Sequence, residues 1–323
     1  MASLLLKSRL ALELPKINGA LKQAAQLLPK PVRPVAEHIF KAGGKRLRPL
    51  LTVLTGKLLG YGQDAIYRLA ITVEMLHAAT LLHDDVIDEA PLRRGQPAAH
   101  TLFALTETIL AGDALLATGN AIVAEFNDPK LSNSFSKATS ETCAGEIDEI
   151  RHQYDPDVSE ATYLQIILGK TARLISCACE MGAILAHGSE QEVASCAAFG
   201  ENIGLAFQLV DDALDFESEE LTGKPTAGDL REGKMTLPLR YYVESLESKA
   251  KADFIQQFKQ GSFTPENCQE IAAKIKELAL DQKTRAHADM YLKKATQALA
   301  NLPNRGEKDL LLAMTDYVRN RNK

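Results

Sequence analysis

The sequence predicts an all-α fold, a large single-domain helical bundle, and three observations predict it. Apolar residues recur with the 3.6-residue period of a helix in almost every segment up to residue 215. Strand signals are nearly absent, because no alternation of Val, Thr or Tyr is bounded by Asn-Gly or Asp-Gly turns. No linker-like or low-complexity tract divides the 323 residues, so we expect one domain, 1–323.

Turn signals such as Gly60-Tyr61-Gly62 and Asn127-Asp128-Pro129 separate the expected helices. The longest irregular segment, 217–234, carries several glycines and Pro225 and directly follows a cluster of carboxylates. A loop of this length in a compact helical protein is often functional. The helices are expected at 3–27, 31–42, 46–59, 64–88, 98–126, 130–150, 159–187, 189–216, 235–246, 248–259, 265–279, 281–301 and 307–320.

The composition excludes several classes of protein. A net charge of −5 argues against nucleic acid as the main partner. No window of about 18 residues is both strongly apolar and free of charge, so we expect no transmembrane segment. The N-terminus lacks an apolar core of secretory length, and the five cysteines, odd in number, are typical of free thiols in a reducing compartment. We therefore expect a cytoplasmic protein.

Two clusters of aspartates with the same spacing close two apolar runs. Asp84, Asp85 and Asp88 form the first cluster, and the same Asp-Asp-x-x-Asp pattern returns later in the chain at Asp211, Asp212 and Asp215. Residues four apart share a helix face, and Mg²⁺ prefers carboxylate oxygens together with substrate phosphates. One cluster is equally well explained as a solvated helix end. Two clusters favour two facing walls of a metal–polyphosphate site.

Cations suited to phosphate accompany both clusters. A glycine-opened turn, 43–48, lets backbone approach an anion, and arginine forks match phosphate oxygens. Each cation alone is more often a solvated charge, but their joint presence favours a site for two diphosphates. His77 lies seven residues before Asp84, and both a satisfied core histidine and a role at the second anion fit it. The cations considered are Lys45, Arg46, Arg48, Arg93, Arg94, Lys170, Lys224 and Lys234.

These motifs, in this order and spacing, resemble the trans-isoprenyl diphosphate synthase family over residues 35 to 240. The resemblance rests on 43–49, 83–88, 93–95, Lys170-Thr171, 207–215 and 223–234. It implies the isoprenoid synthase fold, a helical bundle around a central cavity. It also implies head-to-tail prenyl transfer, in which an allylic diphosphate loses pyrophosphate and isopentenyl diphosphate attacks the allylic cation.

The same resemblance implies roles for individual residues. Two or three Mg²⁺ ions per active site would be held by Asp84, Asp85, Asp88 and Asp211, assisted by Asp212 and Asp215. The allylic diphosphate would be gripped by Arg93, Lys170 and Lys234 with Lys224. Isopentenyl diphosphate would bind without metal to Lys45, Arg48, His77 and Arg94. Thr171 and Gln208 would face the carbocation. No Ser or Cys nucleophile is needed, because the released pyrophosphate can take the proton, and a dry cavity protects the cation.

The sequence departs from the family pattern at three places. Glu149 stands where the family usually has Gln, and His100 and the pair Ala104-Leu105 replace a common Asn and Gly-Asn. We expect none of these residues to touch the metal or diphosphate ligands.

The product length is expected to depend on the helix that carries the first aspartate cluster. Ala79 and Thr80 are small where short-chain members of the family have bulky aromatics, so the pocket floor should lie deeper, at Met75, Leu76 or Ile122. Each isoprene adds about 4–5 Å, close to one helical turn. We therefore expect a long-chain synthase, of about C30–C50 and near octaprenyl, for quinone side chains.

Three alternatives remain from the sequence. They are a short-chain farnesyl or geranylgeranyl diphosphate synthase, a class I terpene cyclase, and a non-catalytic subunit of a heteromeric synthase. A cyclase needs no second diphosphate site, and non-catalytic subunits lose aspartates that this chain keeps. The expected partners are isopentenyl diphosphate, a farnesyl or geranylgeranyl primer, a second copy in a homodimer and a transient membrane contact for product release.

Overall fold

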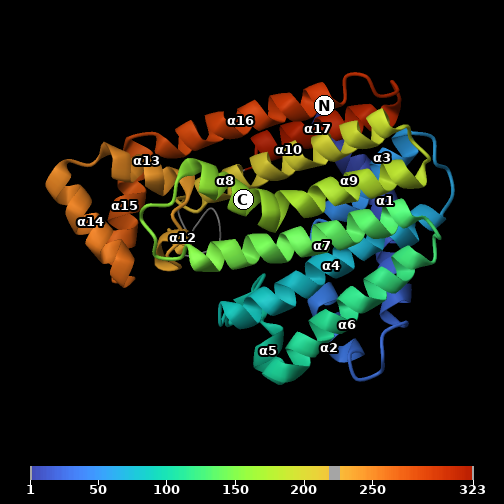
Figure 1. Cartoon of the computed structure of the whole chain (residues 1–323), viewed down its shortest axis with the longest axis horizontal. Helices are drawn as coiled ribbons and strands as arrows, with labels where there is room; N and C mark the ends of the chain where they lie inside the picture. Colours follow the sequence, from blue (N-terminus) through green and yellow to red (C-terminus); the bar gives the residue numbers. More distant parts are fainter. Residues whose placement is uncertain (1, 218–225, 322–323) are drawn as a thin grey trace. The chain divides into compact units, whose positions relative to one another are not determined.

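The computed structural model describes residues 2–217 and 226–321, and nearly all of the regular structure in that part of the chain is helical (Figure 1). The prediction of an all-α fold is confirmed. The helices in its first half are α1 (Ala2–Ala25), α2 (Arg33–Lys41), α3 (Leu47–Leu58), α4 (Ala65–Ile87), α5 (Ala99–Leu102), α6 (Leu105–Ala124) and α7 (Pro129–Arg151).

The second half of the described chain continues with α8 (Glu160–Ile167), a π-helical turn η1 (Leu168–Ala172), α9 (Arg173–Leu185), α10 (Glu190–Leu214), α12 (Gly228–Arg231), α13 (Leu237–Ser245), α14 (Ser248–Gln260), α15 (Pro265–Glu277), α16 (Leu280–Ala298) and α17 (Gly306–Arg319). Most predicted helix boundaries lie within about two residues of these, the usual disagreement at helix ends.

Three predicted elements are wrong in detail. The expected helix 98–126 is two helices, because Phe103 and Ala104 both adopt extended backbone between α5 and α6. The expected helix 159–187 contains the π-helical turn η1. A short hairpin, β1 (Leu92–Arg93) and β2 (Gln96–Pro97), was missed; its two-residue turn is Arg94-Gly95, both at positive φ, as such tight hairpins require.

The chain folds into two compact units, each built from three segments. The first unit comprises Met1–Thr139, Leu174–Ala197 and Asn301–Ala313, and the second comprises Ser140–Arg173, Ala198–Ala300 and Met314–Lys323. Neither unit is a continuous stretch, so no linker marks a boundary in the sequence. The expectation of a single domain stays a prediction.

In the first unit, α4 is the central helix and packs against α1, α3 and α6. It is buried on every side along most of its length, which explains its near-continuous apolar sequence. α6 approaches closely through Gly112, where a Cβ would lie only 2.3 Å from the His83 ring. This packing holds the aspartate end of α4 in place.

In the second unit, glycines bring three backbones together around η1. A Cβ at Gly145 of α7 would lie 2.3 Å from the amide nitrogen of Lys170, and a Cβ at Gly204 of α10 would lie 2.5 Å from the Cα of Ala172. Only residues without side chains permit such approaches. The π-helical turn is therefore held between α7 and α10, and Lys170 faces the acidic residues of α7. Single-turn π-bulges of this kind are frequent at functional sites.

Two helices of the described chain, α4 and α10, are long and apolar enough to cross a membrane by length and composition alone. In α4, 72% of the apolar window is buried inside the structure, and in α10 the figure is 50%. Core helices of soluble proteins pass the same test. The absence of a transmembrane segment stays a prediction.

Candidate functional site

The first aspartate cluster ends α4, and its three carboxylates differ in environment. Asp85 is fully buried, while Asp84 is half-buried and Asp88 exposed. The hairpin folds Arg93 back onto the cluster, as the spacing suggested, so that its Nε donates to Asp85 Oδ1 at 2.6 Å. The second oxygen, Asp85 Oδ2, is buried without a hydrogen-bond partner in the described part of the chain. Such an orphaned acceptor is costly unless a ligand or ion satisfies it.

The predicted isopentenyl diphosphate ligands gather in the first unit around the turn 43–48. Gly44, at φ +147°, leaves room for Arg94, whose guanidinium would lie 2.7 Å from a Cβ there and which donates to the Gly43 carbonyl. Arg48 Nε is buried and finds no hydrogen-bond partner among the described residues. Lys45 is exposed. An unused donor beside a glycine turn is a site ready for an anion.

His77 lies among these cations. Burial, followed by the positive charges of Arg48 and Arg94, lowers the pKa of His77 well below its usual range. The imidazole is therefore neutral at pH 7 in the absence of an anion. Because Arg48 and Arg94 act on His77 through space, the structure brings the three together. We name Arg48, Arg94 and His77 the arginine group.

One member of the basic turn has a structural role instead. Arg46 forms a buried ion pair with Glu74 of α4, and its Nη2 donates to the Phe40 carbonyl at 2.7 Å. Each charge is satisfied by the other, as a buried ion needs. Glu74 was not singled out in the sequence, because a glutamate three residues before His77 gives no local sign of its partner, which immediately precedes α3.

The α4 residues that are expected to limit product length lie on the largely buried part of this helix. Ala79, Met75 and Leu76 are buried, and Thr80 is half-buried with its hydroxyl donating to the His77 carbonyl at 2.9 Å. Beside Met75, a Cβ on Gly119 of α6 would lie 3.2 Å from the Phe135 ring. The fully buried Phe135 therefore adds an aromatic side chain at the depth of Met75, which the sequence analysis did not name.

The second aspartate cluster lies on α10 in the second unit, and its members are tied down individually. Asp212 accepts from Gln208 Nε2 at 2.8 Å and from the hydroxyl of Tyr163. Burial is the main cause that raises the pKa of Asp212 to about 7; the hydrogen bonds from Tyr163 and Gln208 oppose the rise, and the like charges of Asp211 and Asp215 add to it. Tyr163 was missed in the sequence, where it is one aromatic residue in an apolar helix.

Asp215 anchors the segment after α10. Its Oδ2 accepts from the Asp229 amide at 3.0 Å, and its carbonyl accepts from Ala227. The Asp229 carbonyl in turn accepts from the Lys234 amide at 2.8 Å, which brings that lysine back to the cluster. Lys224, the other expected cation of this loop, lies outside the described residues.

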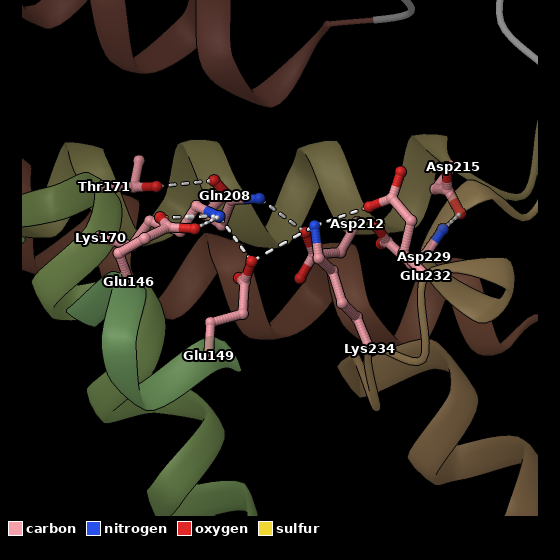
Figure 2. Close-up of polar contacts among 10 residues, drawn as sticks. All are labelled: Glu146, Glu149, Lys170, Thr171, Gln208, Asp212, Asp215, Asp229, Glu232 and Lys234. Carbon is pink, nitrogen blue, oxygen red and sulfur yellow. Dashed lines mark hydrogen bonds and ion pairs between the residues drawn. The ribbon is translucent and has the colours of Figure 1, made fainter. Parts of the chain in front are cut away.

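Figure 2 shows that the predicted diphosphate lysines meet carboxylates. Lys170 Nζ lies 2.5 Å from Glu149 Oε1 and 3.0 Å from Glu146 Oε2, and Lys234 Nζ lies 3.3 Å from the same Glu149 oxygen and 2.6 Å from Glu232. The expectation that Glu149 does not touch the diphosphate ligands is therefore wrong. Helix α7 places Glu149 between the two lysines. Lys170 is 21 positions and Lys234 is 85 positions away from Glu149 in the sequence, so no local pattern reveals these contacts. We name Lys170 and Lys234 the lysine pair.

A polar chain joins η1 to the second cluster. The Thr171 hydroxyl donates to Gln208 Oε1 at 2.9 Å, and the Gln208 amide donates to Asp212 (Figure 2). These residues line a cavity of about 140 Å³ together with the lysine pair, Glu149, Tyr163 and the apolar side chains of Ile166, Ile167 and Met235. This cavity is thus lined by both charged and apolar side chains.

Asp211 has a partner in the segment that follows α17. Arg321 lies 2.7 Å from Asp211 Oδ1, and its guanidinium stacks 4.4 Å from the centre of the Phe207 ring. The sequence analysis attached no role to the C-terminal helices, because a lone arginine in a polar terminus resembles any solvated charge.

The donor set fits a hard cation such as Mg²⁺, although no group of three or more His, Cys, Asp or Glu side chains converges on one point in the residues that the structure describes. The six aspartates offer only carboxylate oxygens, and Asp85 Oδ2 is an unused buried acceptor. Mg²⁺ is commonly bound through one or two carboxylates plus substrate phosphates, so a site of this kind is completed by the diphosphate itself.

Comparison with known proteins adds independent observations. The polyprenyl synthetase family profile matches residues 29–275. Heptaprenyl diphosphate synthase component 2 of Bacillus subtilis is 36% identical over 87% of this chain and 80% of its own, and octaprenyl diphosphate synthase of Haemophilus influenzae is 34% identical over 88% and 87%. A polyprenyl synthase of Caulobacter crescentus, crystallised with calcium and isoprenyl diphosphate, superposes with a TM-score of 0.92 at 33% identity, covering 100% of this chain and 98% of that one.

Proposed function

The chain belongs to the polyprenyl synthetase family of prenyltransferases, and from that premise we propose that it condenses isopentenyl diphosphate with an allylic diphosphate, in a magnesium-dependent reaction, to a long-chain product near octaprenyl. The observation that carries the proposal is the presence of two separate cationic sites. Gly44 leaves room for the Arg94 side chain in the first site, and Gly145 admits the backbone of Lys170 in the second. An enzyme that binds only one diphosphate substrate needs only one such cationic site.

In this proposal the arginine group binds isopentenyl diphosphate without metal, with Lys45 supplying a further charge from the exposed turn. Arg48 offers its unused Nε, and Arg94 is held by the Gly43 carbonyl with the rest of its fork available. Guanidinium forks bind phosphate oxygens in pairs, so they fix the orientation of the diphosphate as well as its position.

The allylic diphosphate is assigned to the lysine pair and the second aspartate cluster of the second unit. Bound Mg²⁺ supplies neutralisation of the charge that develops on the leaving pyrophosphate. In this proposal the lysine pair orients the diphosphate, and Thr171 and Gln208, which are hydrogen-bonded to each other, stabilise the carbocation. The apolar wall of the cavity excludes water, and the departing pyrophosphate accepts the proton.

The small residues on α4 support a long product. Ala79 is buried and lies five residues before Asp84, and Met75 with Phe135 closes the same face more than two turns deeper. An assay with labelled isopentenyl diphosphate and farnesyl diphosphate tests the product length, and a dominant C15 or C20 product would contradict the long-chain proposal. Ala79→Phe should shorten the product, while Ile87→Phe, at an exposed position of the same helix, should leave the length unchanged.

A second candidate is a catalytic subunit that needs a different partner chain, because the Bacillus subtilis relative carries the name component 2. Pyrophosphate release with Mg²⁺, measured for the purified chain with and without isopentenyl diphosphate, separates the possibilities. A synthase releases pyrophosphate only when both substrates and Mg²⁺ are present, a cyclase does so without isopentenyl diphosphate, and a dependent subunit is inactive alone. We propose a homodimer in the cytoplasm, and light scattering of the purified chain tests the dimer.

A further inference from the structure

Two ammonium groups and three carboxylates meet in the second unit (Figure 2), and Glu149, Lys170 and Lys234 among them line its cavity. Glu149 is the centre of this arrangement, because its single oxygen Oε1 lies 2.5 Å from Lys170 and 3.3 Å from Lys234. Glu146 and Glu232 each contact one lysine from the outside. The positive charge of the lysine pair is therefore compensated before any diphosphate arrives.

The compensation is strong because the groups are largely withdrawn from water. The side chains of Glu149 and Lys234 are each 17% exposed, whereas Glu232 is 53% exposed. Burial would raise the pKa of Glu149, but the ammonium groups of Lys170 and Lys234 outweigh it and lower the pKa. Glu149 is accordingly a carboxylate at neutral pH, and its charge acts with little screening.

We propose that Glu149 is a built-in competitor that occupies the lysine pair in the absence of ligand and weakens the retention of diphosphate there. The proposal rests on the proposed function, in which the lysine pair holds the allylic diphosphate. A diphosphate that reaches both lysines must come within a few ångströms of the Glu149 carboxylate, and like charges at that separation repel. Glu149 thereby limits how tightly the site holds pyrophosphate and favours its release after reaction.

Glutamine at this position provides the sharpest test. Glu149→Gln keeps the length of the side chain and one oxygen that accepts a hydrogen bond, but removes the charge. Glu149→Met keeps the approximate shape and removes both. Glu232→Gln is the matched control, because it removes a carboxylate from the same Lys234 at an exposed position where water screens the charge.

The probe is inorganic pyrophosphate with MgCl₂, titrated into the full-length chain by calorimetry. Glu149→Gln and Glu149→Met should each bind pyrophosphate about tenfold more tightly than the wild type, and Glu232→Gln should differ by less than about twofold. Inhibition of product formation by added pyrophosphate should strengthen by the same factor in Glu149→Gln. Circular dichroism and the melting temperature establish that each variant is folded.

Unchanged or weaker pyrophosphate binding in Glu149→Gln would overturn the proposal and leave Glu149 as a residue that positions the lysines. Equal tightening in Glu232→Gln would overturn it too, since the effect would then be one of overall charge. Failure of both Glu149→Gln and Glu149→Met to fold would do the same, because the fold itself would require the carboxylate. A wild-type chain that makes no prenyl product, with Glu149→Gln still binding pyrophosphate more tightly, would refute only the proposed function.

Discussion

The arginine group and the lysine pair are both predicted to bind a diphosphate, but their positive charges are compensated in different ways. In the first unit, Arg94 donates to a backbone carbonyl and Arg48 keeps a buried donor unused among the described residues. In the second unit, both members of the lysine pair contact carboxylates within 3.3 Å. Glu74, which already pairs with Arg46, also attracts Arg48 and Arg94, whereas each lysine of the pair has direct ion pairs of its own.

This difference shows that a cationic residue in a sequence does not by itself indicate an anion-binding site, because its existing counter-ions also matter. Charges crowded together without counter-ions oppose folding, and an anion that binds among them relieves that repulsion. Charges already paired gain less from the same anion, because an existing interaction must be given up. Metal-free binding of isopentenyl diphosphate suits the arginine group, and a metal-assisted diphosphate suits the lysine pair.

The largest expected effect comes from removing the unused donor. Arg48→Met should raise the KM for isopentenyl diphosphate by about 100-fold, since a buried charge-assisted fork is lost. The KM for the allylic substrate should change little. Steady-state kinetics with each substrate varied in turn measure both values.

The matched control for Arg48→Met is Arg68→Met, on α4, where the arginine forms an exposed ion pair with Glu125. Such surface pairs contribute little, so its kinetics should match the wild type. An unchanged KM for isopentenyl diphosphate in Arg48→Met would remove the arginine group from substrate binding and with it half of the comparison.

Charge removal should lower the free energy of unfolding at the lysine pair but not at the arginine group. Lys170→Met leaves Glu146 and Glu149 partly buried with fewer counter-charges, so the free energy of unfolding should fall by about 2 kcal/mol. Arg48→Met relieves crowding, so its free energy of unfolding should stay level or rise. Urea unfolding followed by circular dichroism measures both without substrate.

The double variant Lys170→Met with Glu149→Met serves as the control for that loss. It removes one charge of each sign, so part of the stability lost in Lys170→Met should return. Equal losses in Lys170→Met and Arg48→Met would mean that the two sites do not differ in charge compensation.

Local rules in the sequence predicted much of this molecule. The 3.6-residue period located most helices, and the Asp-Asp-x-x-Asp spacing located two clusters at helix ends. The five-residue step from Asp88 to Arg93 correctly suggested that the arginine folds back, because a hairpin that short leaves few other directions. All of these are relations within about ten residues of sequence.

Relations across the fold were not predictable in the same way. Glu149 reaches Lys234 across 85 positions, Arg46 pairs with Glu74 on another helix, and Arg321 reaches Asp211 from the end of the chain. The π-helical turn at Lys170 follows from the approach of Gly145 and Gly204, neither of which looks unusual in a helical sequence. Such contacts depend on which helices meet, and no periodicity records that.

The smallest predicted effect is the contribution of His77 to the pH dependence of stability, and it tests the difference between the two cationic sites. Its pKa is lowered in the folded chain, so below about pH 6.5 the unfolded chain binds a proton that the folded chain refuses. Stability from this residue is complete above pH 6.5 and is lost as the pH falls toward the folded pKa. Between pH 7 and pH 6 the wild type should therefore lose up to about 1 kcal/mol more than His77→Gln.

Pyrophosphate without metal completes this test, because its charge beside the imidazole favours protonation and should raise the pKa of His77. The difference in pH dependence between wild type and His77→Gln should then shrink, provided that the anion enters the arginine group without Mg²⁺. In chelator-treated protein, unfolding at several pH values with and without pyrophosphate measures it. A difference that pyrophosphate leaves unchanged would mean that the arginine group, like the lysine pair, does not accept a diphosphate unaided.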